Sequence, residues 1–513
     1  MCSDSSSKPG QLPTRLIDVN TLSDPTLARL YSTSTADAEL EYLTLSHCWG
    51  KLEVLKLEGH NLEAMMTGFQ ISKLPRTFQD AIEITRRLGY QYLWIDAMCI
   101  IQDSVDDWSF EALRMAAVYE NGVCNIAALG AVNSHGGCFA TRCPLEHYSC
   151  RLVENSDMDI YATSMETYLE LLSESDPESN APGAIHTRAW IVQERLMSPR
   201  NVYFGSRIIR WECRSKMSKD NSPEKELEND LISDRLALRG KMSKKHFAAL
   251  RQPLNPTTHT TDCETFNVAW GDFVALYTRC ALTQDKDKFF AAAGMVEIVQ
   301  RSTGMTNISG LWEELLPTQI LWRRIFTNKD KDELITQPLY QRAPSWSWVS
   351  RDGPISLYGQ FETSNVLKKV QYQRPPGTHD FSRLTHGQLC IIGEVYQIEK
   401  PQIYGKVSPP YLLMEGPYAI SFHPDEPLRA QSLLQSSLFF LIVSRKQKFI
   451  RGNTSSGGIV EAGIVLTKSP TGRYFHRVGF FEYHYSNSAH TPLLEKKTFS
   501  LFDNSHQLEL VVE

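Results

Sequence analysis

Residues 74–103 decide the fold, and they read LPRTFQDAIEITRRLGYQYLWIDAMCIIQD. The first half predicts a helix over residues 74–88, because apolar side chains recur there at helical spacing and Gly89 follows at the expected stop. Thr77 and Asp80 have the spacing of a capping box at the start of this helix. The apolar stripe consists of Phe78, Ala81, Ile82, Ile84 and Leu88.

The same pattern continues on both sides of this helix. A strand over residues 92–95 ends at Asp96, and an upstream run, 42–46, also reads as a strand. Downstream, acidic residues favour the start of a helix that covers about 106–121, and residues 123–129 are again typical of a strand. Strands separated by helices of this length form βαβ units, so the sequence predicts a parallel sheet covered by helices.

Side chains that could carry chemistry fall at the ends of these predicted strands. Ligands of open parallel sheets bind outside the carboxyl ends of the strands. His47 and Cys48 follow the first strand, and Asp96 and Cys99 follow the second. The sequence therefore favours this edge of the sheet as the place for a site.

Composition limits the class of protein. With 513 residues, 42% hydrophobic and 22% charged, the chain is expected to form two or three globular units. The formal net charge is −6, so the chain has no excess of positive charge. Neither nucleic acid nor a membrane surface is therefore expected as a partner. Eleven cysteines without framework spacing favour reduced thiols, and we expect a cytoplasmic protein with no metal site.

Composition shifts divide the chain into regions. Residues 1–10 are a polar, Ser-rich tail that resembles neither a secretory signal nor an anchor, and 11–214 form the α/β domain. We expect a charged linker over 215–262, a helical region over 263–384, and a β-rich domain over 385–513. Residues 152–187 read as an exposed acidic excursion, and 201–204 with 207–213 as a hairpin. Leu438–Val443 fits a buried strand, and Trp346 and Trp348 alternate as in a strand.

Five blocks of the first 214 residues resemble the fungal heterokaryon-incompatibility (HET) family. They are YLTLSHCWG (42–50), LPRTFQDA (74–81), YLWIDAMCIIQD (92–103), Met115 with Tyr119, and RAWIVQERL (188–196) continuing through WEC (211–213). The block SWSW (345–348) resembles one often found after such a domain, whereas at His47 the family often has tyrosine. The resemblance implies a flavodoxin/TIR-like α/β sheet, followed here by a helical segment and a β-rich region.

The resemblance also implies a function. Members of the family are associated with non-self recognition and programmed cell death. Trp190 and Glu194 have the W-x-x-x-E spacing of TIR domains that cleave NAD, which puts an aromatic ring and a carboxylate on one helix face. Glu194 is then the expected catalytic residue of an NAD hydrolase, with NAD as substrate and no cofactor. The expected ligand-binding residues are Ser46, His47, Trp49, Asp96, Cys99, Trp190, Gln193 and Arg195.

Other interpretations of these residues stay open. Trp190 in the core and Glu194 in an ion pair with a neighbouring arginine is the structural alternative, and Asp96 is also suited to capping a turn. Cys48 or Cys99 with His47 would suit a hydrolase, although small buried cysteines more often pack. His135, Cys138, Cys143, His147 and Cys150 match no zinc spacing. Walker, G-x-G-x-x-G, G-x-S-x-G and H-E-x-x-H strings are absent.

Two classes of function follow. In the first, the chain is an incompatibility effector that consumes NAD. In the second, it is a non-enzymatic signalling module that self-associates. Both classes allow a homo-oligomer and an incompatibility partner protein.

Overall fold

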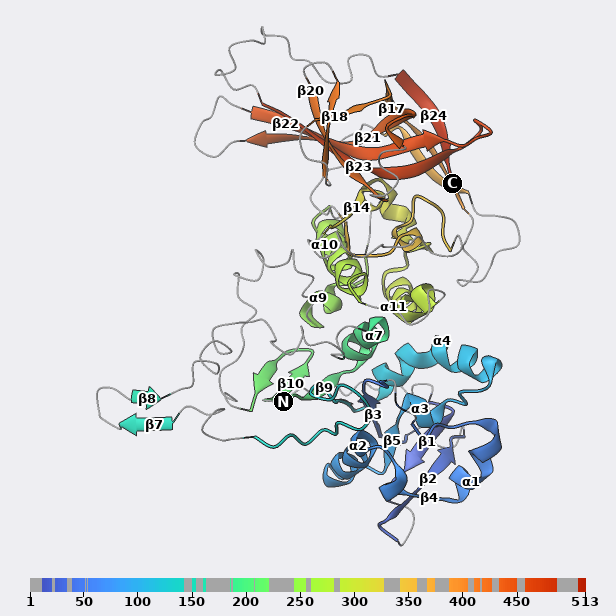
Figure 1. The fold of residues 1–513 in the computed structure, drawn as a ribbon, viewed down its shortest axis with the longest axis vertical. Coiled ribbons are helices and arrows are strands. Elements are labelled where there is room, and N and C mark those ends of the chain that lie inside the picture. Colours follow the sequence, from blue (N-terminus) through green and yellow to red (C-terminus); the bar gives the residue numbers. More distant parts are fainter. Residues whose placement is uncertain are drawn as a thin grey trace. The chain divides into compact units, whose positions relative to one another are not determined.

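Two compact units make up the described part of the chain (Figure 1). The first contains residues up to 220 together with 244–248, 280 and 287–295, and the second contains 249–279 and 296–513. The computed structural model describes residues 12–20, 24–34, 39–50, 52, 54–142, 150–153, 160–162, 185, 188–206, 208–220, 244–254, 260–280, 287–326, 342–357, 367–373, 387–404, 410–415, 418–426, 433–449, 457–486 and 506–513.

A nine-stranded sheet forms the centre of the first unit, in the order β11-β10-β9-β6-β3-β5-β1-β2-β4. Its four central strands, β3 (Tyr42–Ser46), β5 (Tyr92–Trp94), β6 (Cys124–Ala127) and β9 (Arg200–Phe204), are parallel. Numbered along the chain, they lie in the order 2-1-3-4, which is the flavodoxin-like order. The predicted α/β fold is confirmed.

Antiparallel strands extend this sheet at both edges. On one side lie β1 (Arg15–Asp18), β2 (Leu27–Ser32) and the short β4 (Phe69–Gln70). On the other side, β9 continues into β10 (Ile209–Cys213) and β11 (Met217–Lys219), which confirms the predicted hairpin. The sheet is therefore mixed, with a parallel centre.

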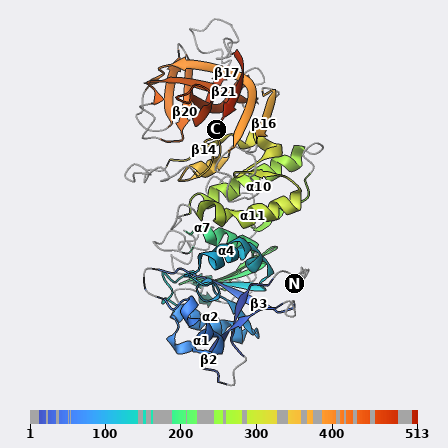
Figure 2. The ribbon, with the colours of Figure 1, turned by 90° about the vertical axis from the view of Figure 1, so that its right-hand side faces the viewer.

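Helices cover both faces of the sheet (Figure 2). Helix α2 (Arg76–Arg87) lies on one face, and α4 (Val105–Asn121) and α7 (Ala189–Met197) lie on the other. Ser104 caps α4 by accepting a hydrogen bond from the Asp107 amide. Shorter helices are α1 (Leu62–Thr67) and α3 (Asp96–Cys99), with 3₁₀ turns at Gly59–Asn61 and Ile71–Lys73.

Two details of α2 differ from the prediction. Thr77 and Asp80 do not form a capping box, because Pro75 is the N-cap and no side chain caps the helix. Leu88 is not part of the core: it lies at the C-cap and is 53% exposed. Its spacing fits the apolar stripe, but the chain turns away at Gly89, which has a φ of +81°.

The acidic excursion and the linker are described only in part. Within them lie the hairpin β7 (Cys150–Val153) and β8 (Ile160–Ala162), and the helix α9 (Lys244–Ala249). Cys143 and His147 fall outside the described residues, which hold no cluster of His, Cys, Asp or Glu suited to a metal ion.

The helical part of the second unit is shorter than predicted. Helix α10 (Thr260–Tyr277) belongs to it, and α11 (Asp287–Thr303) runs across the division between the units. Short strands and one short helix follow: β12 (Asn307–Ile308), β13 (Leu311–Trp312), α12 (Leu316–Gln319), β14 (Trp322–Arg324) and β15 (Ile355–Leu357).

Trp346 and Trp348 are buried, but not in a strand. They lie in a turn that leads into a 3₁₀ helix, Trp348–Ser350. Each indole N–H donates to a main-chain carbonyl, Trp346 to Gly387 at 3.1 Å and Trp348 to Gly310 at 2.8 Å. The alternation predicted from the sequence arises because both rings point inward from a tight turn.

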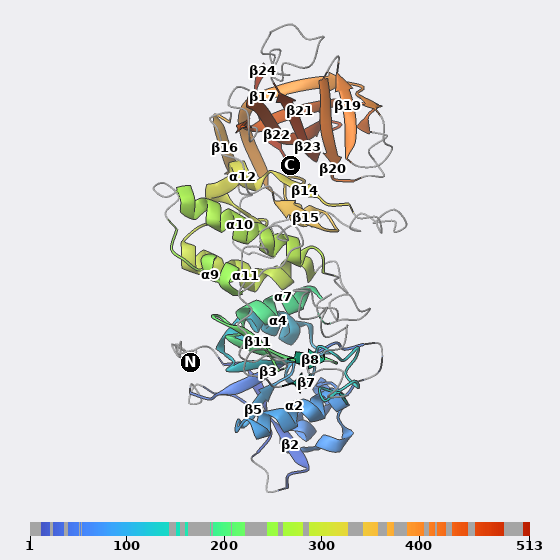
Figure 3. The ribbon, with the colours of Figure 1, turned by 90° about the vertical axis from the view of Figure 1, so that its left-hand side faces the viewer.

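The β-rich region is a second nine-stranded sheet (Figure 3). Strands β17 (Gln388–Glu399), β21 (Ser437–Phe449), β22 (Gly457–Lys468), β23 (Phe475–Ser486) and β24 (His506–Val512) pair in a closed ring. Strands β16 (Lys369–Gln373), β18 (Gln402–Tyr404), β19 (Tyr411–Glu415) and β20 (Tyr418–Pro424) extend it. An apolar core that includes Leu413, Phe422, Phe440, Ile442 and Phe481 fills it, as the apolar runs predicted.

No helix in the described ranges is both long and apolar enough to span a bilayer.

Candidate functional site

Several of the predicted site residues gather where the parallel strand order reverses. Strand β3 lies between β5 and β6, and the chain leaves it first toward β5 and later returns to β6. Ligand crevices of open α/β sheets form outside the carboxyl ends of the strands at such a switch point. Ser46 is the last residue of β3 and pairs with Ala127 at the end of β6, so it stands at this point.

Helix α7 brings Glu194 to the end of β3. The helix buries Ile191, Val192 and Leu196 in the core of the unit. Glu194 is buried with them, and only 2% of its surface is exposed. The Ser46 hydroxyl forms a short hydrogen bond with Glu194 Oε2. Among the described residues, no cation lies within ion-pair distance of Glu194, so its carboxyl group is buried without a salt bridge.

Burial controls the protonation of Glu194. It raises the pKa of this carboxyl group to about 7, and the nearby Asp96 carboxylate adds to the effect. The Arg188 guanidinium and hydrogen bonding by Ser46 and Tyr119 act in the opposite direction. The Glu194 carboxyl group therefore keeps its proton to a higher pH than an exposed glutamate does.

Asp96 joins the cluster from the start of α3. Its Oδ1 accepts the Ala97 amide at 2.7 Å, and its Oδ2 accepts the Trp49 indole N–H at 2.9 Å. The His47 ring stacks on Trp49 and puts Nδ1 3.9 Å from Asp96 Oδ1. The Asp96 side chain is 16% exposed, so it is the more open of the two carboxyl groups.

His47 is a neutral, buried side chain. Burial lowers the pKa of His47 to about 4, Asp96 opposes this shift and Arg188 adds to it. Its Nε2 has no hydrogen-bond partner among the described residues. Arg188 donates to the His47 carbonyl, which ties the start of α7 to the chain that follows β3. Ser46, His47, Trp49, Asp96 and Glu194 thus form one cluster.

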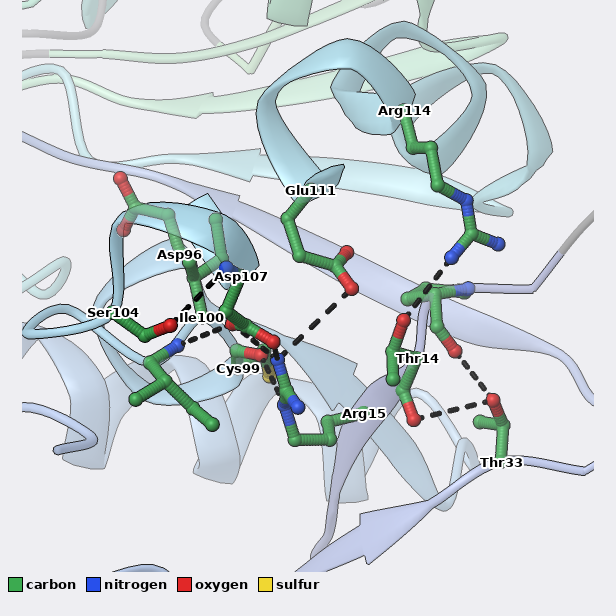
Figure 4. Close-up of polar contacts among 12 residues, drawn as sticks. Thr14, Arg15, Thr33, Asp96, Cys99, Ile100, Ser104, Asp107, Glu111 and Arg114 are labelled. Atoms are coloured by element: carbon green, nitrogen blue, oxygen red, sulfur yellow. Dashed lines mark hydrogen bonds and ion pairs between the residues drawn. The ribbon is translucent and has the colours of Figure 1, made fainter. Parts of the chain in front are cut away.

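Cys99 lies away from this cluster, although it shares α3 with Asp96. Figure 4 shows the Asp96 carboxylate pointing away from Cys99, whose carbonyl accepts Arg15 Nε at 2.8 Å. Arg15 continues into an ion pair with Asp107 at 2.5 Å, which also accepts the Ile101 amide. Burial raises the pKa of the Cys99 thiol to about 12 and raises that of Cys48. Neither thiol is suited to act as a nucleophile near neutral pH.

Arg195 belongs to a second buried cluster. Its guanidinium forms two hydrogen bonds with Glu212, at 2.8 and 3.0 Å. The Tyr203 hydroxyl also donates to Glu212. Burial alone would raise the pKa of Glu212, but Arg195 above all lowers it to about 2. The structure therefore places Arg195 beside Glu212, whereas the prediction placed it in a pocket with Glu194.

The contacts of Trp190 and Gln193 are with other helices. The Trp190 ring packs edge-on against Trp108 of α4, with centroids 6.5 Å apart. The Gln193 amide is 1% exposed and lies close to Gly294, where an added Cβ would be 3.0 Å from its Oε1. Trp49 is the ring that the structure ties to a carboxyl group of the cluster, because its indole N–H donates to Asp96.

The chain after β6 covers the end of β3. The Thr77 hydroxyl accepts the Gly137 amide at 3.0 Å, and Asp80 Oδ2 accepts the Cys138 amide at 2.8 Å. Gly50 has a φ of +74°, and a Cβ there would lie 2.4 Å from Asn133 Cβ. Residues of the block LPRTFQDA thus hold this loop against the switch point.

Comparison with known families gives a match within the first unit. Residues 42–194 match the family model for heterokaryon incompatibility protein (HET). The chain carries a HET domain. No curated protein and no solved structure matched the chain. The match begins with β3 and ends at Glu194, so it contains Ser46, Asp96 and Arg188. It supports a role related to heterokaryon incompatibility, and the predicted family is confirmed.

Several residues around the HET domain cluster were not predicted as site residues. Arg188 and Tyr119 lie in the blocks that resemble the family, but nothing in their spacing shows that they face Glu194. Asn125 and Asn201 interrupt apolar strands, and a buried amide in a strand is the signal that could have identified them.

Gln193 gives a first prediction for the HET domain. Neither atom of its amide has a hydrogen-bond partner among the described residues, and such burial destabilises a protein. Replacing Gln193 with methionine removes both groups at similar volume, so we expect the free energy of unfolding to rise by about 1–2 kcal/mol. Urea unfolding measures this. The exposed Gln70→Met is the control, and a loss of stability only in Gln193→Met would contradict the interpretation.

Proposed function

We propose that the HET domain acts in programmed cell death by hydrolysing NAD, with Glu194 as the catalytic carboxylate. The observation that carries the proposal is the pair of unlike carboxyl groups at the switch point. Glu194 is buried, with a pKa of about 7, and Asp96 is more open and hydrogen-bonded to Trp49. Two carboxyl groups in different environments are typical of enzymes that cleave glycosidic bonds.

The chemistry needs the ionised form of Glu194. When the bond between nicotinamide N1 and ribose C1′ breaks, its electron pair leaves with nicotinamide and the ribose becomes positively charged. A carboxylate in a water-poor site stabilises that charge strongly. Water then attacks C1′ and loses a proton to Glu194. The product of this step is ADP-ribose. In this scheme Asp96 binds the ribose hydroxyls, and the hydrogen bond from Trp49 holds the Asp96 carboxylate in position.

The second candidate is a signalling module without enzymatic activity. It is favoured by the burial of Glu194, whose hydrogen bond with Ser46 also fixes α7 to the sheet. With 2% of Glu194 exposed, a dinucleotide reaches its carboxyl group only when the side chains above it move. In this case the same residues hold a surface through which copies of the chain associate.

Nicotinamide release from NAD by the purified full chain separates the two candidates. We expect turnover by the wild type and a loss of about 100-fold or more in Glu194→Gln, because one stabilising group in such a site is worth that much. Glu83→Gln, on the exposed side of α2, is the matched control and should retain full activity.

Toxicity on expression completes this test. An NAD hydrolase should lose toxicity together with turnover in Glu194→Gln. If the wild type shows no turnover at high protein concentration and toxicity is retained, the signalling module is the correct function.

A further inference from the structure

A row of buried polar side chains crosses the sheet beside Glu194. Ser46 of β3, Asn125 of β6, Asn201 of β9 and Glu212 of β10 stand on adjacent strands, and each is at most 2% exposed. Ser46 Oγ is 3.1 Å from Asn125 Oδ1, and Asn125 Nδ2 is 3.1 Å from Asn201 Oδ1. Asn201 Nδ2 reaches Glu212 Oε2 at 3.4 Å, so the row connects two buried carboxyl groups.

The direction of the hydrogen bonds is set at the Glu212 end. Glu212 is ionised through its pair with Arg195, so its oxygens only accept hydrogen bonds. Asn201 must therefore turn its NH₂ group toward Glu212 and toward the Arg195 carbonyl, which lies at 3.0 Å. Its carbonyl oxygen then faces Asn125.

The same logic fixes Asn125. It must donate its NH₂ group to Asn201, so its Oδ1 faces β3. There the Thr44 hydroxyl donates to it at 3.1 Å. Asn125 consequently presents an acceptor to Ser46, and the row cannot be reversed while Glu212 is charged.

This arrangement decides whether the ionised or the protonated form of Glu194 allows every contact in the row to be a hydrogen bond. The Ser46 hydroxyl has one hydrogen to share between two acceptors, Glu194 Oε2 and Asn125 Oδ1. The Tyr119 hydroxyl also faces Ser46 and Glu194, but its hydrogen is donated to the Leu45 carbonyl at 3.2 Å. If Glu194 is ionised, Ser46 donates to it, and Ser46 and Asn125 then face each other with no hydrogen between them. If Glu194 is protonated, it donates to Ser46, Ser46 donates to Asn125, and both contacts are hydrogen bonds.

We propose that Asn125 and Asn201 form a relay that, by presenting an acceptor to Ser46, favours the proton on Glu194. They are positioning residues that act through Ser46. The inference deepens the proposed function, because the relay sets the pH at which Glu194 becomes the active carboxylate. Only this effect on NAD turnover rests on the proposed function.

Other groups also face Glu194 and act in parallel with the relay. They are Arg188 at the start of α7, Asp96 of α3, Tyr119 of α4 and Cys48 after β3. Arg195, Tyr203 and Lys244 face the opposite end at Glu212. None of these seven residues is changed in the variants that test the relay.

Infrared spectroscopy tests the relay without any substrate. The carboxylic acid band that disappears in Glu194→Gln reports the proton on Glu194, and its pH midpoint is measured on the full chain. We expect a midpoint near pH 7 in the wild type. In Asn125→Val and in Asn201→Val the midpoint should fall by about one pH unit, a tenfold loss of proton affinity. The reason is that Ser46 can no longer donate to Asn125 when Glu194 is protonated. Valine suits a buried strand.

Asn201→Val is the decisive variant, since Asn201 has no hydrogen bond to Glu194 and the loss of its carbonyl oxygen lets Asn125 turn over. Thr44→Val is the matched control: it removes a different hydrogen bond to Asn125 and should leave the midpoint unchanged. Unchanged midpoints in both Asn variants would overturn the relay. If one valine variant does not fold, the other decides, and Asn201→Ser serves if neither folds. The infrared titration is done without NAD, so it does not depend on turnover. If the nicotinamide-release assay shows no activity, the proposed function is overturned, but the infrared result still stands.

Discussion

Replacing Arg477 with methionine is expected to destabilise the second unit by about 3–5 kcal/mol, the usual cost of breaking a buried ion pair. Arg477 is 0% exposed and pairs with Asp425, which is 1% exposed, at 3.0 Å. Its guanidinium also donates to the carbonyls of Ile320 and Trp322 and lies 3.4 Å from the centroid of the Trp322 ring. The variant leaves a buried carboxylate and two carbonyls without their donor.

Calorimetry of the full chain measures this effect. Arg473→Met, an exposed arginine in the turn between β22 and β23, is the matched control and should change stability by less than about 0.5 kcal/mol. Adding Asp425→Leu to Arg477→Met should recover part of the loss, because no unpaired charge then remains. Equal stability of the Arg477 variant and its control would contradict this account.

Replacing Arg195 with methionine should destabilise the first unit by a similar amount, about 3–5 kcal/mol. Glu212 is 2% exposed and, among the residues that the structure describes, would keep only the Tyr203 hydroxyl and the Asn201 amide as donors. The exposed pair of Arg87 with Glu83 provides the control, and Arg87→Met should cost less than about 1 kcal/mol.

The Arg195 variant also has an expected pH dependence. Glu212 has a folded pKa of about 2, below its usual 4.5, so its pair stabilises the fold above pH 4.5. This stabilisation is lost as the pH falls from 4.5 toward 2. The difference in free energy of unfolding between the wild type and Arg195→Met should therefore be smaller at pH 4 than at pH 7. Urea unfolding at the two pH values measures this difference. A gap that widens at pH 4 would contradict the assignment of Glu212 as the charged partner.

Local patterns were enough to predict the parallel centre of the first unit. Residues 42–46, 74–88 and 92–95 each show one periodicity over their whole length, and tertiary packing did not override it. The antiparallel edges were not predicted as part of the sheet, because β1 and β2 gain their place by pairing with β5 and with each other.

The site was predictable in its location but not in its contacts. Ser46 and Asp96 could be placed at strand ends from the sequence, whereas their link to Glu194 depends on how α7 crosses the sheet. The relay through Asn125 depends on strand order and register, which no single segment encodes. Arg195 shows the limit most clearly: it is adjacent to Glu194 in the sequence, but helix geometry turns neighbouring side chains to different faces.

The pH dependence of NAD hydrolysis tests the central claim most directly. Glu194 must be ionised to act, and burial raises its pKa to about 7. We therefore expect kcat/KM of the purified full chain to rise from pH 6 to pH 8 with a midpoint near 7, and this rise to be absent in Glu194→Gln. A wild-type profile that is flat or falls over this range, or one that Glu194→Gln reproduces, would contradict the claim.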